Sequence, residues 1–190
     1  MPFTPTNVVV GLWLGLFAVW IVAALGAKRT MRSEFGWPRV GQLVLNVTTW
    51  LLMTGRVLDD TVWSERALPD TLAIGVAGSA LALAGAVFTL WARFTIGRNW
   101  SGNITVKTDH ELMTRGPYAI VRHPIYFGLL VTLAGTAVVV GEYRAFLAVV
   151  VAIVAWKWKS SIEERVMTEH FGDAYRDYKR RTKALIPFVL

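Results

Sequence analysis

The stretch GPYAIVRHPIYFG, residues 116–128, marks the point where a polar and basic segment gives way to an apolar one. Pro124 suits the first position of a helix, which puts Arg122 and His123 directly before a helix begins. Free backbone N–H groups at such a start favour negatively charged groups. Residues 125–140 carry no charge and predict a helix within a membrane. The stretch therefore indicates a polar site at a membrane surface; the alternative is a basic loop that only anchors a transmembrane helix.

The composition is that of an integral membrane protein. Of the 190 residues, 54% are hydrophobic and 17% are charged, whereas a soluble domain carries about 25% charged residues. The mean hydropathy is +0.45. The chain contains no Cys, which excludes disulfides, thiolate metal sites and a Cys nucleophile. One compact membrane domain over residues 1–190 is the simplest organisation.

Five apolar stretches predict an all-α, polytopic membrane helix bundle with five transmembrane helices. They cover residues 8–27, 40–58, 72–92, 125–141 and 145–160. The first contains 20 residues without a charge, which is enough to cross about 30 Å of hydrocarbon. The second carries Gln42, Asn46 and Arg56, so we expect a weaker span or one that faces the bundle interior. The third is rich in Gly and Ala, which favours close helix packing.

The fifth stretch needs a longer helix than its apolar residues alone provide. Its uncharged run, residues 145–156, would be about 18 Å long as a helix. Lys157 and Lys159 follow, and their charged ends can reach the membrane surface. We therefore expect one helix over residues 145–171 that leaves the bilayer and projects into water as a cytoplasmic C-terminal extension. Gly172 should end this helix, and a short final helix follows it.

The basic residues indicate how the chain is oriented. Seventeen of the 20 Lys and Arg residues lie in three regions, 28–39, 93–123 and 157–190. Five spans put these regions on one side of the membrane, and the positive-inside rule makes that side cytoplasmic. The N-terminus is then outside and the C-terminus cytoplasmic, and we expect the protein in a bacterial or archaeal cell membrane. This topology accounts for the net charge of +7 without nucleic acid as a partner.

The fourth and fifth helices are expected to form a hairpin that brings charged residues to one depth. Its turn, at residues 142–143, follows His123 by 19 residues and precedes Glu163 by 20. Two antiparallel helices with the same rise per residue bring such positions to the same height. Arg122 and His123 should therefore meet Glu163 and Glu164 at the cytoplasmic surface of the membrane.

These charged side chains suit a small zwitterionic or cationic ligand. Tyr126 lies one turn into the helix beside them, and aromatic faces favour cations. The alternative is that Glu163 and Glu164 belong to an ordinary solvated helix face. His123 and His170 together resemble a metal pair, but the spacing to carboxylates is not characteristic, and we expect no metal. No Gly-rich phosphate motif follows a strand, so a Rossmann-type nucleotide domain is not expected.

Several motifs in the second half of the chain form a recognisable set. They are Arg98-Asn99-Trp100, the stretch 116–128, the pair Glu163-Glu164, the run 171–178 and Ile186-Pro187. In these motifs residues 97–187 resemble the isoprenylcysteine carboxyl methyltransferase family and its relatives, the membrane phospholipid methyltransferases. The first three spans match in hydrophobicity alone. Family members often carry Arg four residues before the Glu pair, where Lys159 keeps the charge but loses the bidentate fork.

The resemblance implies a membrane methyltransferase that uses S-adenosyl-L-methionine and a lipophilic acceptor, with a carboxylate preferred. It implies a cytoplasmic cofactor-binding part formed by residues 93–123 and 157–187. By position, the implied cofactor-binding residues are Tyr118, His123, Tyr126, Gly128, Glu163 and Glu164. Arg122 would hold or polarise the acceptor and, with Glu163, is the implied catalytic pair. Arg98, Asn99 and Trp100 would lie near the entrance for the acceptor.

The residue types agree with this chemistry. Methyl transfer from a sulfonium is an in-line displacement, so alignment supplies much of the rate. A carboxylate acceptor needs only a cation such as Arg122, whereas an amine or phenol acceptor would need a base, for which Glu163 or His123 could serve. The acceptor's identity and the oligomeric state stay open.

Two other functions are compatible with parts of the pattern. The first is an NADPH-dependent membrane reductase of sterol-reductase-like type, but its phosphates need cations rather than paired Glu side chains. The second is a non-catalytic membrane scaffold, which leaves the matched depth of the charged pairs unexplained.

Overall fold

The computed structural model describes residues 4–25, 30–33, 37–55, 58–97, 100, 105–107, 111–187 and 189, and for residues 24–25, 30–33, 37–38 and 105–107 it describes the backbone alone. The chain forms six helices, two short strands and two 3-10 turns within these ranges. In chain order they are α1 (Pro5–Leu25), β1 (Thr30–Ser33), α2 (Trp37–Thr54), η1 (Val62–Ser64), α3 (Leu72–Ile96), β2 (Thr105–Lys107), η3 (Gly116–Ala119), α4 (Pro124–Val140), α5 (Tyr143–Phe171) and α6 (Asp173–Arg181).

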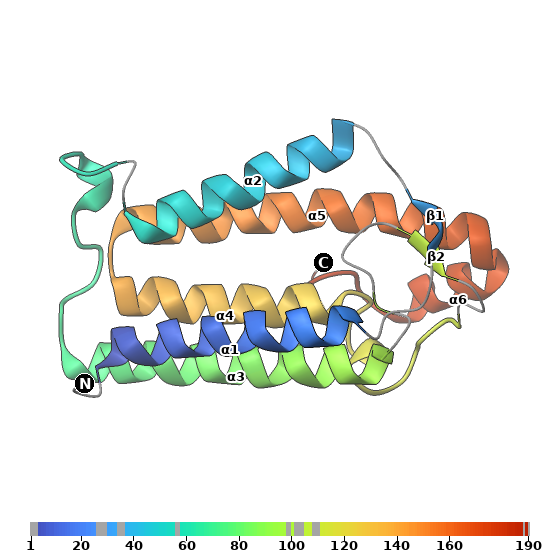
Figure 1. Ribbon diagram of the computed structural model, residues 1–190, viewed down its shortest axis with the longest axis horizontal. Helices are drawn as coiled ribbons and strands as arrows, with labels where there is room; N and C mark the ends of the chain where they lie inside the picture. Colours follow the sequence, from blue (N-terminus) through green and yellow to red (C-terminus); the bar gives the residue numbers. More distant parts are fainter. Residues whose placement is uncertain are drawn as a thin grey trace.

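The long helices run side by side in two layers. Helices α2 and α5 form one layer, and α1, α3 and α4 form the other (Figure 1). The strands and α6 lie at one end of the bundle, and the N-terminus and the η1 loop lie at the other (Figure 1). This arrangement separates a polar end from the apolar helices that carry it.

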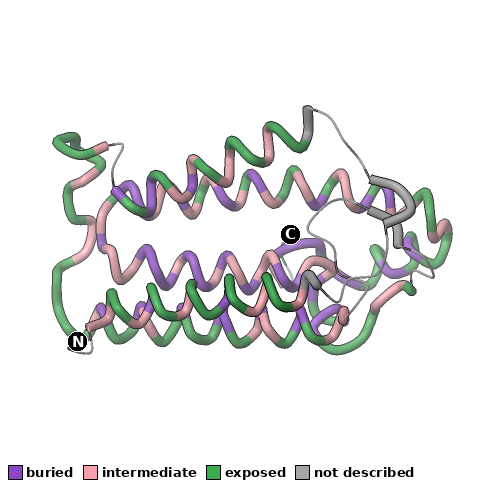
Figure 2. The backbone as a smooth tube through the Cα atoms, in the orientation of Figure 1, coloured by how far each residue is buried: buried purple, intermediate pink, exposed green. Residues whose placement is uncertain are grey.

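The helices have the composition of membrane-spanning segments. Within the described residues, three are long and apolar enough to cross a membrane: Pro5–Ala23, Leu72–Ile96 and Tyr143–Phe171. Helix α4 is equally apolar but has 17 residues. Large apolar side chains on α1, such as Leu14 (64% exposed) and Ile21 (69%), face outward along most of its length (Figure 2). An apolar surface of this size is typical of contact with lipid.

A helix lies at each of the five predicted apolar stretches, but several ends differ; α1 and α2 each begin three residues earlier than predicted. Helix α2 ends at Thr54, four residues before the predicted end, because Gly55 adopts a left-handed backbone with φ of 86°. Helix α3 continues one turn past the predicted end and takes Arg93 into its last turn. Helix α5 runs unbroken over Tyr143–Phe171 and ends at Gly172 (φ 56°), which confirms the predicted extension. Arg56, one of the polar residues in the second predicted span, lies outside the described residues.

The structure is mostly helical, as predicted, and adds one short strand pair that the sequence did not predict. Strands β1 and β2 pair antiparallel, with Thr30 opposite Lys107 and Ser33 opposite Thr105. Two connecting segments that leave the bundle at the same end lie alongside each other there, and their backbone groups pair. Strands of four and three residues are too short to show an alternating pattern in the sequence.

Helices α3 and α4 pack backbone to backbone through glycines. A Cβ atom at Gly85 would lie 2.7 Å from the carbonyl oxygen of Gly128, and one at Gly135 would lie 2.6 Å from that of Gly78. The hydroxyl of buried Thr132 donates to the carbonyl of Gly128 at 2.9 Å, so this polar side chain is satisfied within its own helix. The predicted close packing of the Gly- and Ala-rich third span is confirmed, and its partner is α4.

Buried Arg144 ties the two helices of the other layer together at the end opposite to α6. Its Nη1 donates to the carbonyls of Leu52 (2.7 Å) and Met53 (3.0 Å) at the end of α2, and its Nε donates to Glu142 at 2.6 Å. Gly55 leaves room for the guanidinium, because a Cβ there would lie 2.6 Å from its central carbon. These bonds fix the start of α5 against the end of α2.

The contact between α3 and α4 yields a stability prediction. Gly135→Ala places a methyl group against the backbone of α3 and should lower the free energy of unfolding by about 1–3 kcal/mol. Gly15→Ala on α1 is the matched control, since nothing lies within 4 Å of a Cβ there. Thermal unfolding of both variants in detergent, followed by Trp fluorescence, measures the difference. Equal midpoints for the two variants would contradict the described packing.

Candidate active site

Four charged side chains meet where α4 begins and the polar half of α5 passes it. Nη2 of Arg122 lies 2.6 Å from Oε1 of Glu164, and Nδ1 of His123 lies 3.3 Å from Oε2 of Glu163. Nε2 of His123 lies 3.4 Å from Oε1 of Glu164. The predicted meeting of these side chains at one depth is confirmed. We refer to Arg122, His123, Glu163 and Glu164 as the ionic cluster.

The local backbone explains why both basic residues face α5. Pro124 starts α4, and His123 precedes it with a non-helical backbone and no side-chain capping bond, so its imidazole is free to turn toward α5. The backbone N–H groups of Arg122 and His123 donate to the carbonyls of Lys183 (2.8 Å) and Ala184 (2.9 Å). The C-terminal segment thus holds the backbone of Arg122 and His123 in place between η3 and α4.

The guanidinium of Arg122 is engaged on all sides. Its Nε donates to Oε1 of Glu164 at 2.7 Å, and its Nη1 donates to the carbonyls of Thr182 and Lys179. Its side chain is 8% exposed. Arg122 therefore orients Glu164 and fixes the end of α6. The predicted contact of Arg122 with an acceptor is not tested by this arrangement and stays a prediction.

Glu163 has a separate set of partners. The hydroxyl of Tyr126 donates to its Oε1 at 2.7 Å, and Nζ of Lys159 lies 4.0 Å from the same oxygen. That ammonium also lies 5.3 Å from the centre of the Tyr126 ring. On the other carboxylate, Oε2 of Glu164 lies 2.9 Å from Nζ of Lys179. Each carboxylate is thus compensated by its own cations and donors.

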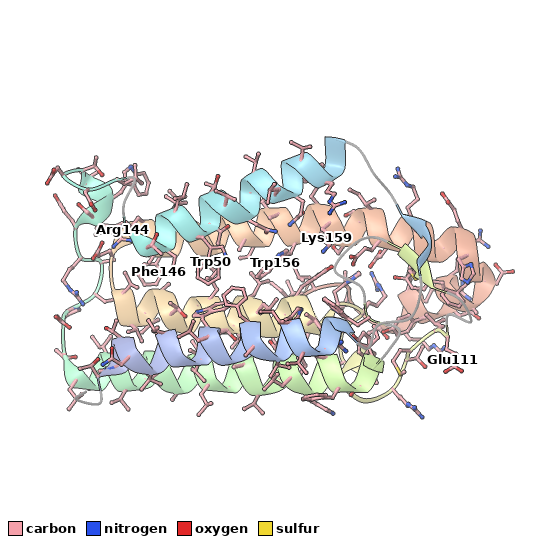
Figure 3. All side chains as sticks on the ribbon, in the orientation of Figure 1. Trp50, Glu111, Arg144, Phe146, Trp156 and Lys159 are labelled. Atoms are coloured by element: carbon pink, nitrogen blue, oxygen red, sulfur yellow. The ribbon has the colours of Figure 1, made fainter. Side chains whose placement is uncertain are left out.

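Aromatic rings stack against the ionic cluster from the apolar side. The Tyr126 ring is nearly parallel to the His123 ring at 5.5 Å and to the Trp156 ring at 6.1 Å. Trp156 and Trp50 lie between the two helix layers (Figure 3). The site therefore changes from charged to aromatic over a short distance along α5.

The environment of His123 favours its charged form. Burial lowers the pKa of the imidazole, but hydrogen bonding to Glu163 and the negative charges of Glu163 and Glu164 outweigh burial and raise the pKa above 6.5. Nε2 of His123 is buried and makes no hydrogen bond, although it lies near Glu164. Burial, with Tyr178 and Glu163 nearby, also raises the pKa of Tyr118, so this phenol stays protonated.

The raised pKa of His123 can be measured directly. Because the folded state favours protonated His123, the stability that it contributes is complete below a pH of about 6.5 and is lost as the pH rises through the raised pKa. NMR titration of ring-labelled His in detergent should give His123 a pKa above 6.5, lowered in Glu163→Gln. Glu169→Gln on the same helix should leave it unchanged. A wild-type value at or below 6.5 would refute this electrostatic account.

The other predicted site residues are distributed differently. Tyr118 is buried in η3, and its carbonyl accepts a hydrogen bond from the hydroxyl of Tyr178 at 2.5 Å. Gly128 lies against α3, where a Cβ would meet Thr89, so the structure assigns it to helix packing and does not bring it to the ionic cluster. Trp100 packs on Arg93 and Trp20. Arg98 and Asn99 lie outside the described residues.

Two residues of the site were missed by sequence reasoning. Trp156 lies seven residues before Glu163, which is two turns on the same helix face, and this spacing was a usable signal. Lys179 reaches Glu164 from α6, and only the docking of α6 on α5 reveals it.

A polar hollow of about 440 Å³ opens behind Glu164 between α5 and α6 and is lined further by Arg165, Thr168 and Arg176.

The fold and the site define a helical integral membrane protein whose charged site lies just beyond its apolar helices. The sequence pattern of the family described as phospholipid methyltransferase matches residues 73–174, which is more than half of the chain. The chain therefore belongs to the phospholipid methyltransferase family.

Similar curated proteins are named protein-S-isoprenylcysteine O-methyltransferases. Over 151 residues the chain is 30% identical to protein-S-isoprenylcysteine O-methyltransferase of Rattus norvegicus, covering 77% of this chain and 51% of that protein. It is 31% identical over 117 residues to protein-S-isoprenylcysteine O-methyltransferase B of Arabidopsis thaliana, covering 59% and 58% of the two chains. The chain thus spans about half the length of the curated relatives it matches.

A solved structure shares the fold. The eukaryotic intramembrane Ras methyltransferase ICMT aligns with a TM-score of 0.56 and 22% identity, over 82% of this chain and 55% of that one. The membrane helix bundle is therefore common to both proteins.

Proposed function

We propose that the protein is an integral membrane methyltransferase that transfers a methyl group from S-adenosyl-L-methionine to a lipophilic acceptor, with a carboxylate as the acceptor group. The observation that carries this proposal is the ionic cluster at the polar end of the bundle. It combines two carboxylates, an imidazole and an aromatic stack beside apolar helices. Membership of the phospholipid methyltransferase family and likeness to isoprenylcysteine O-methyltransferases support the same chemistry.

The site residues fit the proposed cofactor. When bound, S-adenosyl-L-methionine supplies an electrophilic methyl group on a sulfonium. Glu163 would face positive charge, and the rings of Tyr126 and Trp156 favour a cation in the same place. His123 offers a buried Nε2 that makes no hydrogen bond in the protein itself. Tyr118 and Glu164 would complete the set, and the polar hollow behind Glu164 gives a polar molecule access from water.

The chain's own residues orient the groups that would bind the reactants. Tyr126 and His123 fix the Glu163 carboxylate, and Arg122 fixes Glu164, so these groups require little rearrangement. A carboxylate acceptor is already a nucleophile, so no residue has to remove a proton from it. The apolar helices on the other side of the aromatic stack suit an acceptor that arrives from the bilayer, with Arg98, Asn99 and Trp100 proposed at its entrance.

The membrane topology is part of the proposal. We assign all five helices α1–α5 as spans, with the N-terminus outside and the C-terminus cytoplasmic. The distribution of Lys and Arg supports this orientation. The opposite ends of the bundle at which the N-terminus and α6 lie are compatible with it (Figure 1). A bacterial or archaeal origin stays a prediction, and the curated relatives named above are eukaryotic.

Binding of the methylation product tests the function. Calorimetric titration of the purified protein with S-adenosylhomocysteine should give saturable heat, and titration with NADPH should give none. Glu163→Gln should weaken the binding at least about tenfold, because a charge-assisted contact is lost. Glu65→Gln makes the same chemical change at an exposed position beside η1, at the opposite end of the bundle, and should bind like the wild type.

Each alternative function has its own outcome in these titrations. Saturable binding of NADPH would favour a reductase. The absence of binding heat in both titrations would favour a scaffold. Neither alternative gains support from the family match or from the relatives' names.

The topology has an independent test, because the chain contains no Cys. Asp70→Cys in the loop before α3 and Ala174→Cys in α6 introduce single thiols at exposed positions. In intact cells a membrane-impermeant maleimide should label Asp70→Cys, and it should label Ala174→Cys after the membrane is opened. The reverse pattern would invert the proposed orientation, and labelling of both in intact cells would exclude five spans.

A further inference from the structure

Arg93 is a buried cation that the ionic cluster does not use. It lies in the last turn of α3 and is 4% exposed. Its Nη1 donates to the carbonyl of Gly97 at 2.8 Å, and its Nη2 donates to the carbonyl of Ala23 on α1 at 3.0 Å. In the described part of the chain its hydrogen bonds go to carbonyl oxygens and to no carboxylate. Its positive charge is therefore not matched by a formal negative charge there.

The two helix ends explain only part of this placement. Carbonyls at the C-terminal ends of α1 and α3 carry partial negative charge and stabilise a cation. Nε of Arg93 is nevertheless buried and has no hydrogen-bond partner among the described residues. A buried donor without a partner is costly, and charged residues within membrane helices commonly mark ligand sites. The unpaired Nε–H indicates that a further acceptor binds to this guanidinium.

The surroundings of Arg93 connect it to the proposed reaction. Its guanidinium lies 4.7 Å from the centre of the Trp100 ring, the residue expected near the entrance for the acceptor. Trp100 and Tyr126 pack on the same apolar cluster, and Tyr126 donates to Glu163. Tyr118 lies within electrostatic range of both Arg93 and Glu163. Arg93 and the ionic cluster therefore border one shared apolar region.

A carboxylate acceptor needs a cation that is free to bind it. The donors of Arg122 are taken by Glu164 and by two backbone carbonyls. Lys159 and Lys179 lie beside Glu163 and Glu164. Arg93 is different, because it combines a spare N–H with a position beside Trp100 and apolar side chains.

We propose that Arg93 is the residue that binds the carboxylate of the lipophilic acceptor, beneath the ring of Trp100. This assignment rests on the proposed methyltransferase function and names the residue that recognises the acceptor's charge. A guanidinium suits the task because it can donate two parallel hydrogen bonds to a carboxylate.

The assignment also bears on product release. In the transfer, an oxygen of the acceptor carboxylate forms a bond to the methyl carbon while the carbon–sulfur bond breaks and its electron pair stays on sulfur. No proton moves, and the carboxylate becomes a neutral ester. Arg93 then faces an uncharged group and loses the charge-assisted hydrogen bond. The site therefore binds the acid more tightly than the ester.

The test compares an acid with its own methyl ester. N-acetyl-S-farnesylcysteine and its methyl ester have the same hydrophobic tail and differ in charge. We titrate each into the full chain in phosphatidylcholine nanodiscs by calorimetry, without cofactor. The wild type should bind the acid at least about tenfold more tightly than the ester. Arg93→Met should reduce this ratio to near one, and Arg93→Lys should give an intermediate ratio. Arg180→Met, at an exposed position of α6 outside the polar hollow, should keep the wild-type ratio.

Several results would overturn the assignment. Equal binding of acid and ester by the wild type would do so, as would an unchanged ratio in Arg93→Met. Binding of S-adenosylhomocysteine by Arg93→Met at wild-type strength verifies its fold. If Arg93→Met does not bind S-adenosylhomocysteine, the acid-to-ester ratio of Arg93→Lys is used instead. A wild-type ratio in Arg93→Lys would then overturn the assignment.

Two further measurements distinguish an anionic lipid headgroup from the acceptor carboxylate and separate the role of Arg93 from the function of the protein. An anionic headgroup on Arg93 would lower the wild-type ratio to the Arg93→Met value in phosphatidylglycerol nanodiscs, and that result would also overturn the assignment. The acid-to-ester ratio is measured without cofactor, so it does not depend on binding of S-adenosylhomocysteine. If the proposed function is wrong, the wild-type protein will not bind S-adenosylhomocysteine, and this result is obtained independently of the ratio.

Discussion

Two neighbouring carboxylates, one half-buried and one buried, have to be compensated, and much of the polar end of the molecule follows from this constraint. Glu163 and Glu164 are consecutive on one helix, so their side chains point about 100° apart, and among their partners they share His123. Glu163 is therefore served by the start of α4, through His123 and Tyr126. Glu164 needs cations from another direction, and Arg122 and Lys179 provide them. Lys179 belongs to α6, so the contact that compensates the charge of Glu164 also holds α6 against α5.

Close packing in the apolar half of the molecule holds the helices that carry the charged side chains. Helices α3 and α4 approach so closely at Gly85, Gly128 and Gly135 that side chains between them are excluded. At the opposite end, Arg144 fixes α5 to α2. The start of α4 and the middle of α5 are thus held by packing far from the charged groups. Small residues and one buried arginine set the depth at which Arg122 and His123 meet the glutamates.

The sequence was informative where a single physical rule decided the outcome. Equal rise along two antiparallel helices was enough to bring Arg122 and His123 level with Glu163 and Glu164, and Gly172 correctly ended α5. Where the outcome depended on tertiary contacts, local patterns did not suffice. Gly128 was predicted to bind the cofactor because of its motif, yet it packs closely against Thr89 of α3. The pairing of β1 with β2 and the reach of Lys179 depend on segments far apart in the chain. The extra turn of α3 was missed because Arg93 ends the apolar run in the sequence, although two of its N–H groups donate to carbonyls at the helix ends.

The return of the C-terminal segment to the 116–128 stretch has a consequence for biosynthesis. The backbone N–H groups of Arg122 and His123 are bonded to Lys183 and Ala184, and Leu185 is buried in the bundle. A nascent chain that has already formed helices α1–α5 still lacks these bonds while residues 183–185 remain in the ribosome's exit tunnel. The site is therefore completed only once residues 183–185 have left the ribosome, and a chain cut before Lys183 would form the helices without these bonds.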